Sequence, residues 1–248
     1  MNAKTNISST LRIVAILLLT PVFCFLSSSK AKAQVGEHRN DLAIGVNFGY
    51  TINKVTFSPI IKQKWKDNPS GGITLRYTCE KYFSCLCALQ VELNYANLGW
   101  EELIETSTDT YTRNMHYIQF PMLARLAWGR EEKGAMFYFL AGPQLGYCIG
   151  EQEIKGGAFD ESTLNKRPGG IVQQYGKMND NALDYGITAG LGLEINTKRA
   201  GHFMVEGRYY FALGDIYNNG KRDPFSRSAN GTIVAKLTYL FDVIKTER

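Results

Sequence analysis

The feature that most constrains the fold of this chain is a series of segments in which apolar residues alternate strictly with small or polar ones. Alternation with a period of two is typical of β-strands that have two different faces. Eight such segments occur, each of roughly 9 to 15 residues, which is long enough to cross a bilayer at a tilt. They span residues 41–51, 71–79, 85–99, 116–128, 135–149, 183–196, 203–213 and 232–241.

The connections between these segments alternate in length. The short ones are 80–84, 129–134 and 197–202, and the long, polar ones are 52–70, 100–115, 150–182 and 214–231. Short turns at one rim and long loops at the other are typical of barrels in the bacterial outer membrane. The sequence therefore predicts an all-β, eight-stranded antiparallel transmembrane β-barrel in the cell outer membrane, with its N- and C-termini periplasmic.

The alternation alone does not say which face points into the barrel, because a soluble barrel is apolar inside and a membrane barrel is apolar outside. The polar face carries Gly186, Gly190 and Gly192, and a narrow lumen needs such small residues. The apolar face carries aromatic residues near segment ends, such as Tyr50 and Phe241, as expected at a membrane interface. These features favour the membrane barrel, and a soluble lipocalin-like ligand-binding barrel is the alternative.

The first 33 residues have the pattern of a cleaved signal peptide. Lys4 and Arg12 precede an apolar run at 13–26, and Ala31 and Ala33 precede the expected cleavage site. The alternative is a membrane anchor, but the apolar run is too short to span a bilayer comfortably. We therefore expect residues 1–33 to be removed and residues 34–248 to form a single barrel domain outside the cytoplasm.

The charge balance argues against nucleic acid as a partner. The chain has 28 basic and 23 acidic residues, but four of the basic residues lie in the predicted signal peptide, which contains no acidic residue. The barrel is therefore almost neutral, whereas proteins that bind polyanions usually carry a clear excess of positive charge. The expected environment is outer-membrane lipid and lipopolysaccharide.

Neither the cysteines nor the histidines form a recognisable site. In an exported chain a disulfide from Cys79 to Cys85 or Cys87 is possible, but the cysteines lie in apolar segments, so their state stays open. The histidines share no metal-ligand spacing and are expected on the surface. No cluster of catalytic residue types is visible, so we expect no enzymatic activity, metal or cofactor. The residues concerned are Cys79, Cys85, Cys87, Cys148, His38, His116 and His202.

The most informative polar residues are eight charged ones on the face predicted to point into the lumen. Because buried charges need partners, they are expected to form ion pairs and hydrogen bonds that fill the interior. The alternative is a selectivity ring in a small passive channel. Eight strands leave little interior space, which favours the filled lumen. The eight residues are Arg76, Glu92, Arg125, Asp184, Glu194, Glu206, Arg208 and Lys236.

The first long connection is a candidate contact surface. It carries Lys54, Lys62, Lys64 and Lys66 beside Trp65. Such a group is suited to lipopolysaccharide phosphates or to a protein partner, because binding residues often lie on loops. The simpler interpretation is a solvated rim.

Two motifs, Ile118-Gln119-Phe120-Pro121-Met122-Leu123 and Ala141-Gly142-Pro143-Gln144-Leu145-Gly146, resemble the PorT family of Bacteroidetes outer-membrane β-barrel proteins, often called the porin family. Gln90-Val91-Glu92-Leu93-Asn94-Tyr95 adds to the likeness, which extends over residues 42–241. The resemblance implies the fold and the location of an outer-membrane β-barrel. Because PorT is linked to type IX secretion, it also implies an accessory role in the export of surface proteins and partners in a secretion system. One departure is that residues 242–248 follow Phe241, whereas such barrels usually end on an aromatic residue.

Overall fold

The computed structural model describes residues 36–105, 108–157, 171–197 and 200–246. The predicted signal peptide, residues 1–33, lies outside the described residues. In the part of the chain that is described, no helix is long and apolar enough to cross a membrane.

The described residues form one antiparallel sheet that closes on itself. Its order is β2-β4-β3-β1-β9-β8-β7-β6-β5, and an additional pairing between β4 and β5 completes the circle. Strand β2 has only two residues and pairs with the end of β4, so eight long strands form the barrel wall in the described chain. The strands are β1 (Glu37–Ser58), β2 (Gln63–Lys64), β3 (Lys66–Tyr82), β4 (Cys85–Glu102), β5 (Thr110–Gly129), β6 (Gly134–Gly156), β7 (Leu183–Thr197), β8 (Gly201–Ala212) and β9 (Arg227–Ile244).

Each of the eight predicted strands is present, but most are longer than predicted. The prediction ended the first strand at Thr51, whereas β1 continues to Ser58. It started the fourth strand at His116, whereas β5 starts at Thr110. The long connections are correspondingly shorter, at 59–65, 103–109, 157–182 and 213–226.

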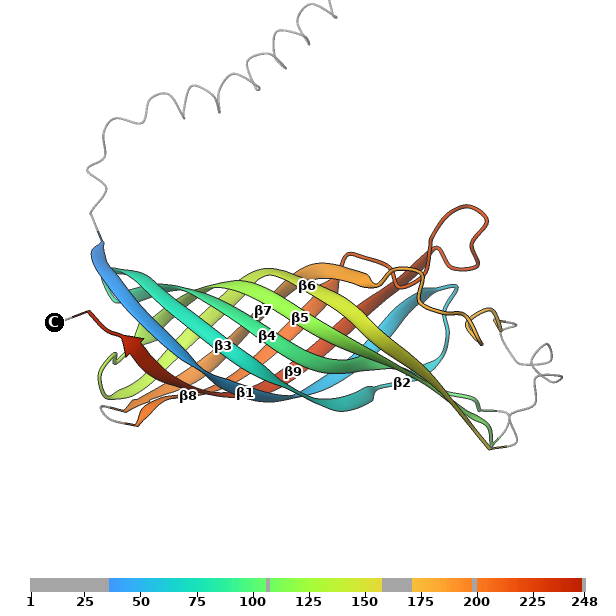
Figure 1. Cartoon of the computed structure of the whole chain (residues 1–248), viewed down its shortest axis with the longest axis horizontal. Coiled ribbons are helices and arrows are strands. Elements are labelled where there is room, and N and C mark those ends of the chain that lie inside the picture. Colours follow the sequence, from blue (N-terminus) through green and yellow to red (C-terminus); the bar gives the residue numbers. More distant parts are fainter. Residues whose placement is uncertain (1–35, 106–107, 158–170, 198–199, 247–248) are drawn as a thin grey trace, which may run out of the picture. The chain divides into compact units, whose positions relative to one another are not determined.

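The two ends of the barrel differ, as Figure 1 shows. One end, called the turn end here, holds the three short connections together with the start of β1 and the end of β9. The opposite end, called the loop end, holds the four longer connections. The predicted alternation of short turns and long loops is therefore confirmed.

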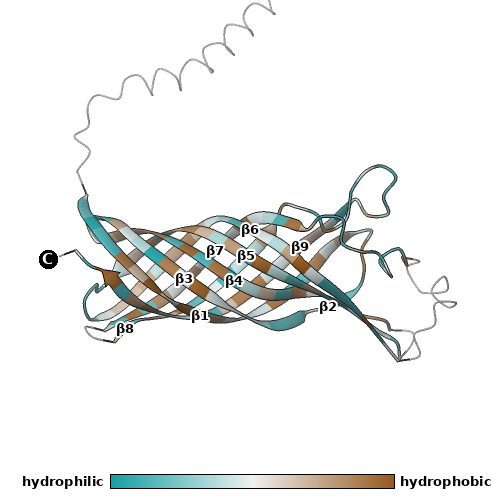
Figure 2. Ribbon diagram, viewed as in Figure 1, coloured by the Kyte–Doolittle hydropathy of each residue, from teal (hydrophilic) through white to brown (hydrophobic). Residues whose placement is uncertain are grey.

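The outer surface around the middle of the barrel is apolar, because large hydrophobic side chains from all eight long strands are exposed there. Figure 2 shows hydrophobic residues alternating with hydrophilic ones along these strands. In a barrel in water these side chains would be inside, so the soluble lipocalin-like alternative is wrong. We call this surface the outer belt. It includes Val46, Phe48, Ile73, Leu89, Leu93, Ile118, Phe120, Phe137, Phe139, Leu145, Tyr185, Ile187, Leu191, Leu193, Phe203, Val205, Phe211, Leu237, Tyr239 and Phe241.

The lumen behind the outer belt is narrow and polar. Two glycines on β7 make room for large side chains of other strands. A Cβ atom at Gly192 would lie 2.5 Å from the hydroxyl of Tyr138, and one at Gly190 would lie 2.8 Å from Cγ of Arg208. Both contacts are too short, so the small residues predicted for the lumen allow Tyr138 and Arg208 to lie across it.

Towards the loop end the alternation reverses, and apolar side chains point inward. Val55 and Phe57 on β1, Trp100 on β4 and Tyr111 on β5 are buried there. The outward positions between them are polar, as at Lys54. This part of the wall therefore encloses an apolar core, whereas the part behind the outer belt encloses charges.

Candidate functional site

The first group of charged residues in the lumen is centred on Glu92 of β4. Arg208 donates two hydrogen bonds to the Glu92 carboxylate, at 2.6 and 3.0 Å, and Lys236 donates a third at 2.6 Å. Arg208 also pairs with Glu206 at 2.6 Å. The side-chain amide of Gln90 donates a further hydrogen bond to Glu92 at 2.8 Å. Two cations therefore face two carboxylates, and this Glu92 cluster is charge-balanced.

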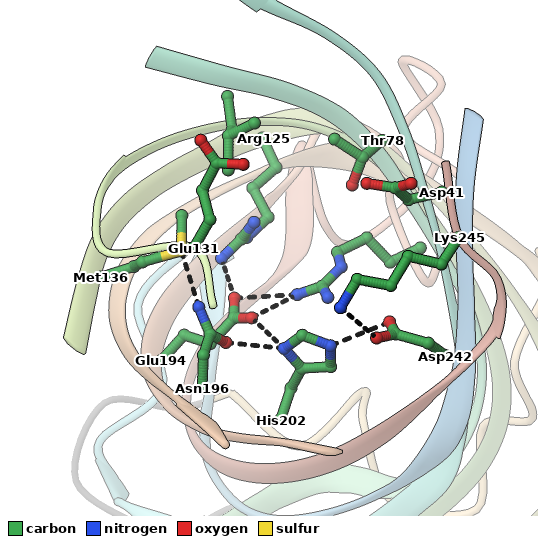
Figure 3. A pocket seen from close by; sticks show the side chains of 12 residues that line it. Asp41, Thr78, Arg125, Glu131, Met136, Glu194, Asn196, His202, Asp242 and Lys245 are labelled. Atoms are coloured by element: carbon green, nitrogen blue, oxygen red, sulfur yellow. Dashed lines mark hydrogen bonds and ion pairs between the residues drawn. The ribbon is translucent and has the colours of Figure 1, made fainter. Parts of the chain in front are cut away.

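The second group is centred on Glu194 of β7 and lies nearer the turn end. Arg76 of β3 donates to both Glu194 oxygens at 2.8 Å, and Arg125 of β5 pairs with one of them. His202 lies 2.8 Å from Glu194 through Nδ1 and 2.9 Å from Asp242 through Nε2. Figure 3 shows Arg125, Glu194, His202 and Asp242 turned toward one another.

One side chain connects the Glu92 and Glu194 clusters. The Tyr138 hydroxyl donates a hydrogen bond to Glu206 at 2.9 Å. The guanidinium of Arg125 lies over the Tyr138 ring, 4.1 Å from its centre. The two clusters therefore form a continuous network along the lumen, and its side chains are buried except that of Asp242 at the turn end, which is partly exposed.

A small cavity lies at the turn end beside the Glu194 cluster (Figure 3). Its volume is about 40 Å³, and its lining includes Arg76, Glu194, His202 and Asp242. A water molecule in the liquid occupies roughly 30 Å³. The cavity can therefore hold solvent but is too small for an organic ligand.

The structure places seven of the eight predicted lumen charges in these two clusters. The eighth, Asp184 of β7, is also buried, but no ion pair joins it to a cation within the described residues. It accepts a hydrogen bond from the side chain of Asn230 at 3.2 Å. Asp184 therefore has the hydrogen-bond partner that was predicted for a lumen charge, and only the ion pair is missing, because neutral polar side chains such as Asn230 lie beside it.

Sequence reasoning missed His202 and Asp242. His202 was predicted on the surface, but only 9% of it is exposed and it lies in β8. A signal for both was present, because His202 is in phase with the inward residues Met204 and Glu206, and Asp242 with the inward Leu240. The predicted strands leave out both positions, because segment 203–213 begins just after His202 and segment 232–241 ends just before Asp242.

An aromatic core closes the loop end. The Phe57 ring lies 5.0 Å from Trp100 and 5.3 Å from Phe225, and Tyr217 stacks on Phe225 at 5.4 Å. Tyr217 and Phe225 belong to the connection between β8 and β9, so this connection folds into the mouth of the barrel. We call this group, with Tyr111, the mouth core.

Arg113 of β5 reinforces the wall of the mouth core. It forms ion pairs with Glu151 at 2.9 Å and with Glu153 at 2.7 Å, both on β6. Its guanidinium lies 6.0 Å from the centre of the Trp100 ring. The sequence does not single out Arg113, because it lies in the predicted connection 100–115 and outside the predicted strands.

The predicted basic surface is mostly neutralised. Lys62 pairs with Glu105 at 2.8 Å and Lys64 with Glu101 at 3.1 Å, whereas Lys54 lies over the exposed Trp65 ring at 5.6 Å. Lys66 is the exception to the predicted exposure. It is buried at the start of β3 and donates a hydrogen bond to Asn114, so the prediction of a surface contact is wrong for Lys66.

The cysteines of the barrel are free thiols, so the described chain contains no bridge among Cys79, Cys85, Cys87 and Cys148. A search of the described residues found no group of three or more His, Cys, Asp or Glu side chains placed to hold a metal ion.

Comparisons with known proteins identify the family. Among solved structures the chain is similar to Ail, the attachment invasion locus protein of Yersinia pestis, with 14% identity over 83% of this chain and 99% of that one and a TM-score of 0.34. Neisserial surface protein A is 12% identical over 80% of this chain and 99% of that one, with a TM-score of 0.39. OprG of Pseudomonas aeruginosa is 9% identical over 84% of this chain and 96% of that one, with a TM-score of 0.41. No curated protein matches the chain. The family model described as "Outer membrane protein beta-barrel domain" matches residues 32–218, so the chain belongs to this family of outer-membrane β-barrels.

Proposed function

We propose that this outer-membrane protein is a sealed, non-enzymatic barrel whose role is carried out by the surface at its loop end rather than by its lumen. The observation that carries the proposal is the continuous filling of the interior. The Glu194 and Glu92 clusters occupy the lumen, and the mouth core lies above them. Because each cluster is paired internally, its charges are not free to line a water-filled path.

The proposed orientation places the loop end outside the cell and both termini in the periplasm. It is supported by the short connections at the turn end, since short turns are periplasmic and longer loops are extracellular in barrels of this class. The loop end then presents Lys54, Trp65 and the exposed Ile60 to the cell exterior. These side chains are suited to contact a protein partner or the headgroups of lipopolysaccharide.

The first expected result is that the barrel does not conduct ions. Purified protein reconstituted in planar bilayers should show no steady conductance above the lipid background, because no continuous water path crosses the two charge clusters. A general porin added to the same bilayers serves as the positive control. The passive-channel alternative would be supported by steady currents whose ion selectivity changes in a Glu92→Gln variant.

The finer proposal, an accessory role in protein export, rests on the sequence resemblance to the PorT family. We expect that deletion of the gene lowers the amount of secreted and surface-attached proteins, and that plasmid-borne wild-type protein restores it. An unchanged surface proteome in the deletion strain would reject the export role and leave a structural or partner-binding role at the loop end.

A further inference from the structure

A second cavity, much larger than the one at the turn end, lies on the outer side of the loop end. It is an open groove of about 620 Å³, within the range typical of small-molecule sites. One wall comes from residues that precede and begin β7, including Asp180 and Tyr185, and the other from the connection after β8, including Asp215, Asn218 and Asn219. Neither wall belongs to the lumen network.

The walls of the groove are held together by hydrogen bonds between the two connections. The backbone N–H groups of Asp180 and Asn181 donate to the Ile216 carbonyl at 3.2 and 3.1 Å. The side-chain amide of Asn181 donates to the Asp215 carbonyl at 3.0 Å, and the backbone N–H of Asn218 donates to the Asp180 carboxylate at 3.0 Å. These hydrogen bonds fix the two connections relative to each other, so the groove is a defined part of the fold.

The charges in the groove are already compensated within the chain. Asp180 pairs with Lys177 at 2.7 Å, and Asp215 pairs with Arg227 at 3.7 Å. Burial raises the pKa of the Asp180 carboxyl, but the hydrogen bonds from Lys177 and Asn218 outweigh this effect and hold the pKa below its usual range. The groove thus offers the ionised Asp180 carboxylate, the Asp215 carboxylate and neutral amides, and the Arg227 cation in its described lining is already paired.

The edge of the groove that faces the outer belt is apolar and continues that belt. Leu183, Tyr185 and Leu213 line it, and about half of each side chain is exposed. Tyr185 and Leu183 point outward on β7 in phase with Ile187 of the outer belt. A ligand in the groove would therefore meet lipid on one side and hydrogen-bonding groups on the other.

We propose that this groove binds the sugar headgroup of a glycolipid in the outer leaflet of the membrane. A pyranose ring has an apolar face, which fits the Tyr185 ring and the leucines, and a rim of hydroxyl groups, which fits amides and carboxylates. A phosphate would face two carboxylates whose cation partners are engaged. The inference rests on the proposed orientation, since the groove must lie at the outer leaflet.

The test uses native mass spectrometry of the full mature barrel in detergent. The added lipids are rough lipopolysaccharide, which is lipid A with inner-core sugars, and phosphatidylethanolamine, which carries no sugar. The groove variant carries Asn218→Ala, which removes an exposed amide. Asn219 is kept, because its side-chain amide donates a hydrogen bond to the Asp215 carboxylate at 3.0 Å within the groove wall. The matched control is Gln152→Ala, an exposed amide on β6 outside the groove lining.

Wild-type protein and the Gln152→Ala control should retain rough lipopolysaccharide, and the groove variant should bind it about tenfold more weakly, because hydrogen bonds to the sugar hydroxyls are lost. Equal retention by the groove variant, or equal retention of phosphatidylethanolamine, which carries no sugar, would overturn the proposal. The free core oligosaccharide, which has no acyl chains, tests whether the groove recognises a membrane glycolipid or any soluble sugar. If it binds as tightly as the glycolipid, the acyl chains contribute nothing to binding and the glycolipid assignment is wrong. The groove variant should remain silent in planar bilayers, so a failure here is distinguishable from a failure of the sealed barrel.

Discussion

Replacing Glu92 by glutamine is expected to destabilise the barrel strongly. The substitution keeps the volume of the side chain but removes the carboxylate that pairs with both Arg208 and Lys236. Removing one partner of a buried ion pair typically costs about 3–5 kcal/mol, because the remaining charge is left without compensation. The free energy of unfolding in urea, followed by the gel shift between folded and unfolded forms, measures the effect.

Two further variants separate charge from shape. The double variant Glu92→Gln with Lys236→Met should recover part of the lost stability, since Arg208 and Glu206 then remain as a balanced pair. Glu105→Ala breaks the exposed pair with Lys62 and should cost no more than about 1 kcal/mol. A Glu92→Gln barrel that is as stable as wild type would mean that solvent in the lumen already screens these charges.

The second large effect is expected at the mouth core. Trp100 is fully buried there, in contact with the Phe57, Tyr111 and Tyr217 rings. Truncating a buried tryptophan to alanine typically costs about 3–5 kcal/mol, because transfer free energy is lost and a cavity remains. Trp100→Ala should therefore lower the free energy of unfolding and open the mouth core to solvent.

The control is Trp65→Ala, which removes a tryptophan that is 56% exposed at the same end of the barrel. It should change the free energy of unfolding far less, because little buried surface is lost. Both variants should stay electrically silent, since the two charge clusters below the mouth core are intact. Currents through Trp100→Ala would show instead that the mouth core alone seals the barrel.

The strand pattern was predictable because local chemistry dictates it. Within the outer belt each strand has lipid on one side and a narrow lumen on the other, so Ile187 and Leu191 must alternate with residues such as Gly190. Towards the loop end the strands could not be predicted from this alternation, because there the inside of the barrel is apolar and the outside is polar. Phe57 and Trp100 point into a core, and water replaces lipid outside. The strands continue, but the phase of their apolar residues reverses.

By itself, the sequence determined the all-β class, the eight long strands, the alternation of turns and loops, and which charged residues point inward. Those features depend on neighbours along the chain and on the two faces of a strand. The tertiary structure alone decided which charges meet. Arg76 on β3 reaches Glu194 on β7, and Glu92 on β4 reaches Arg208 on β8. In each pair the strands lie four places apart in the closed sheet of eight long strands, on opposite sides of the lumen. Which side chains face each other across the lumen depends on the closure and stagger of the whole barrel, and alternation within a strand carries no information about that stagger.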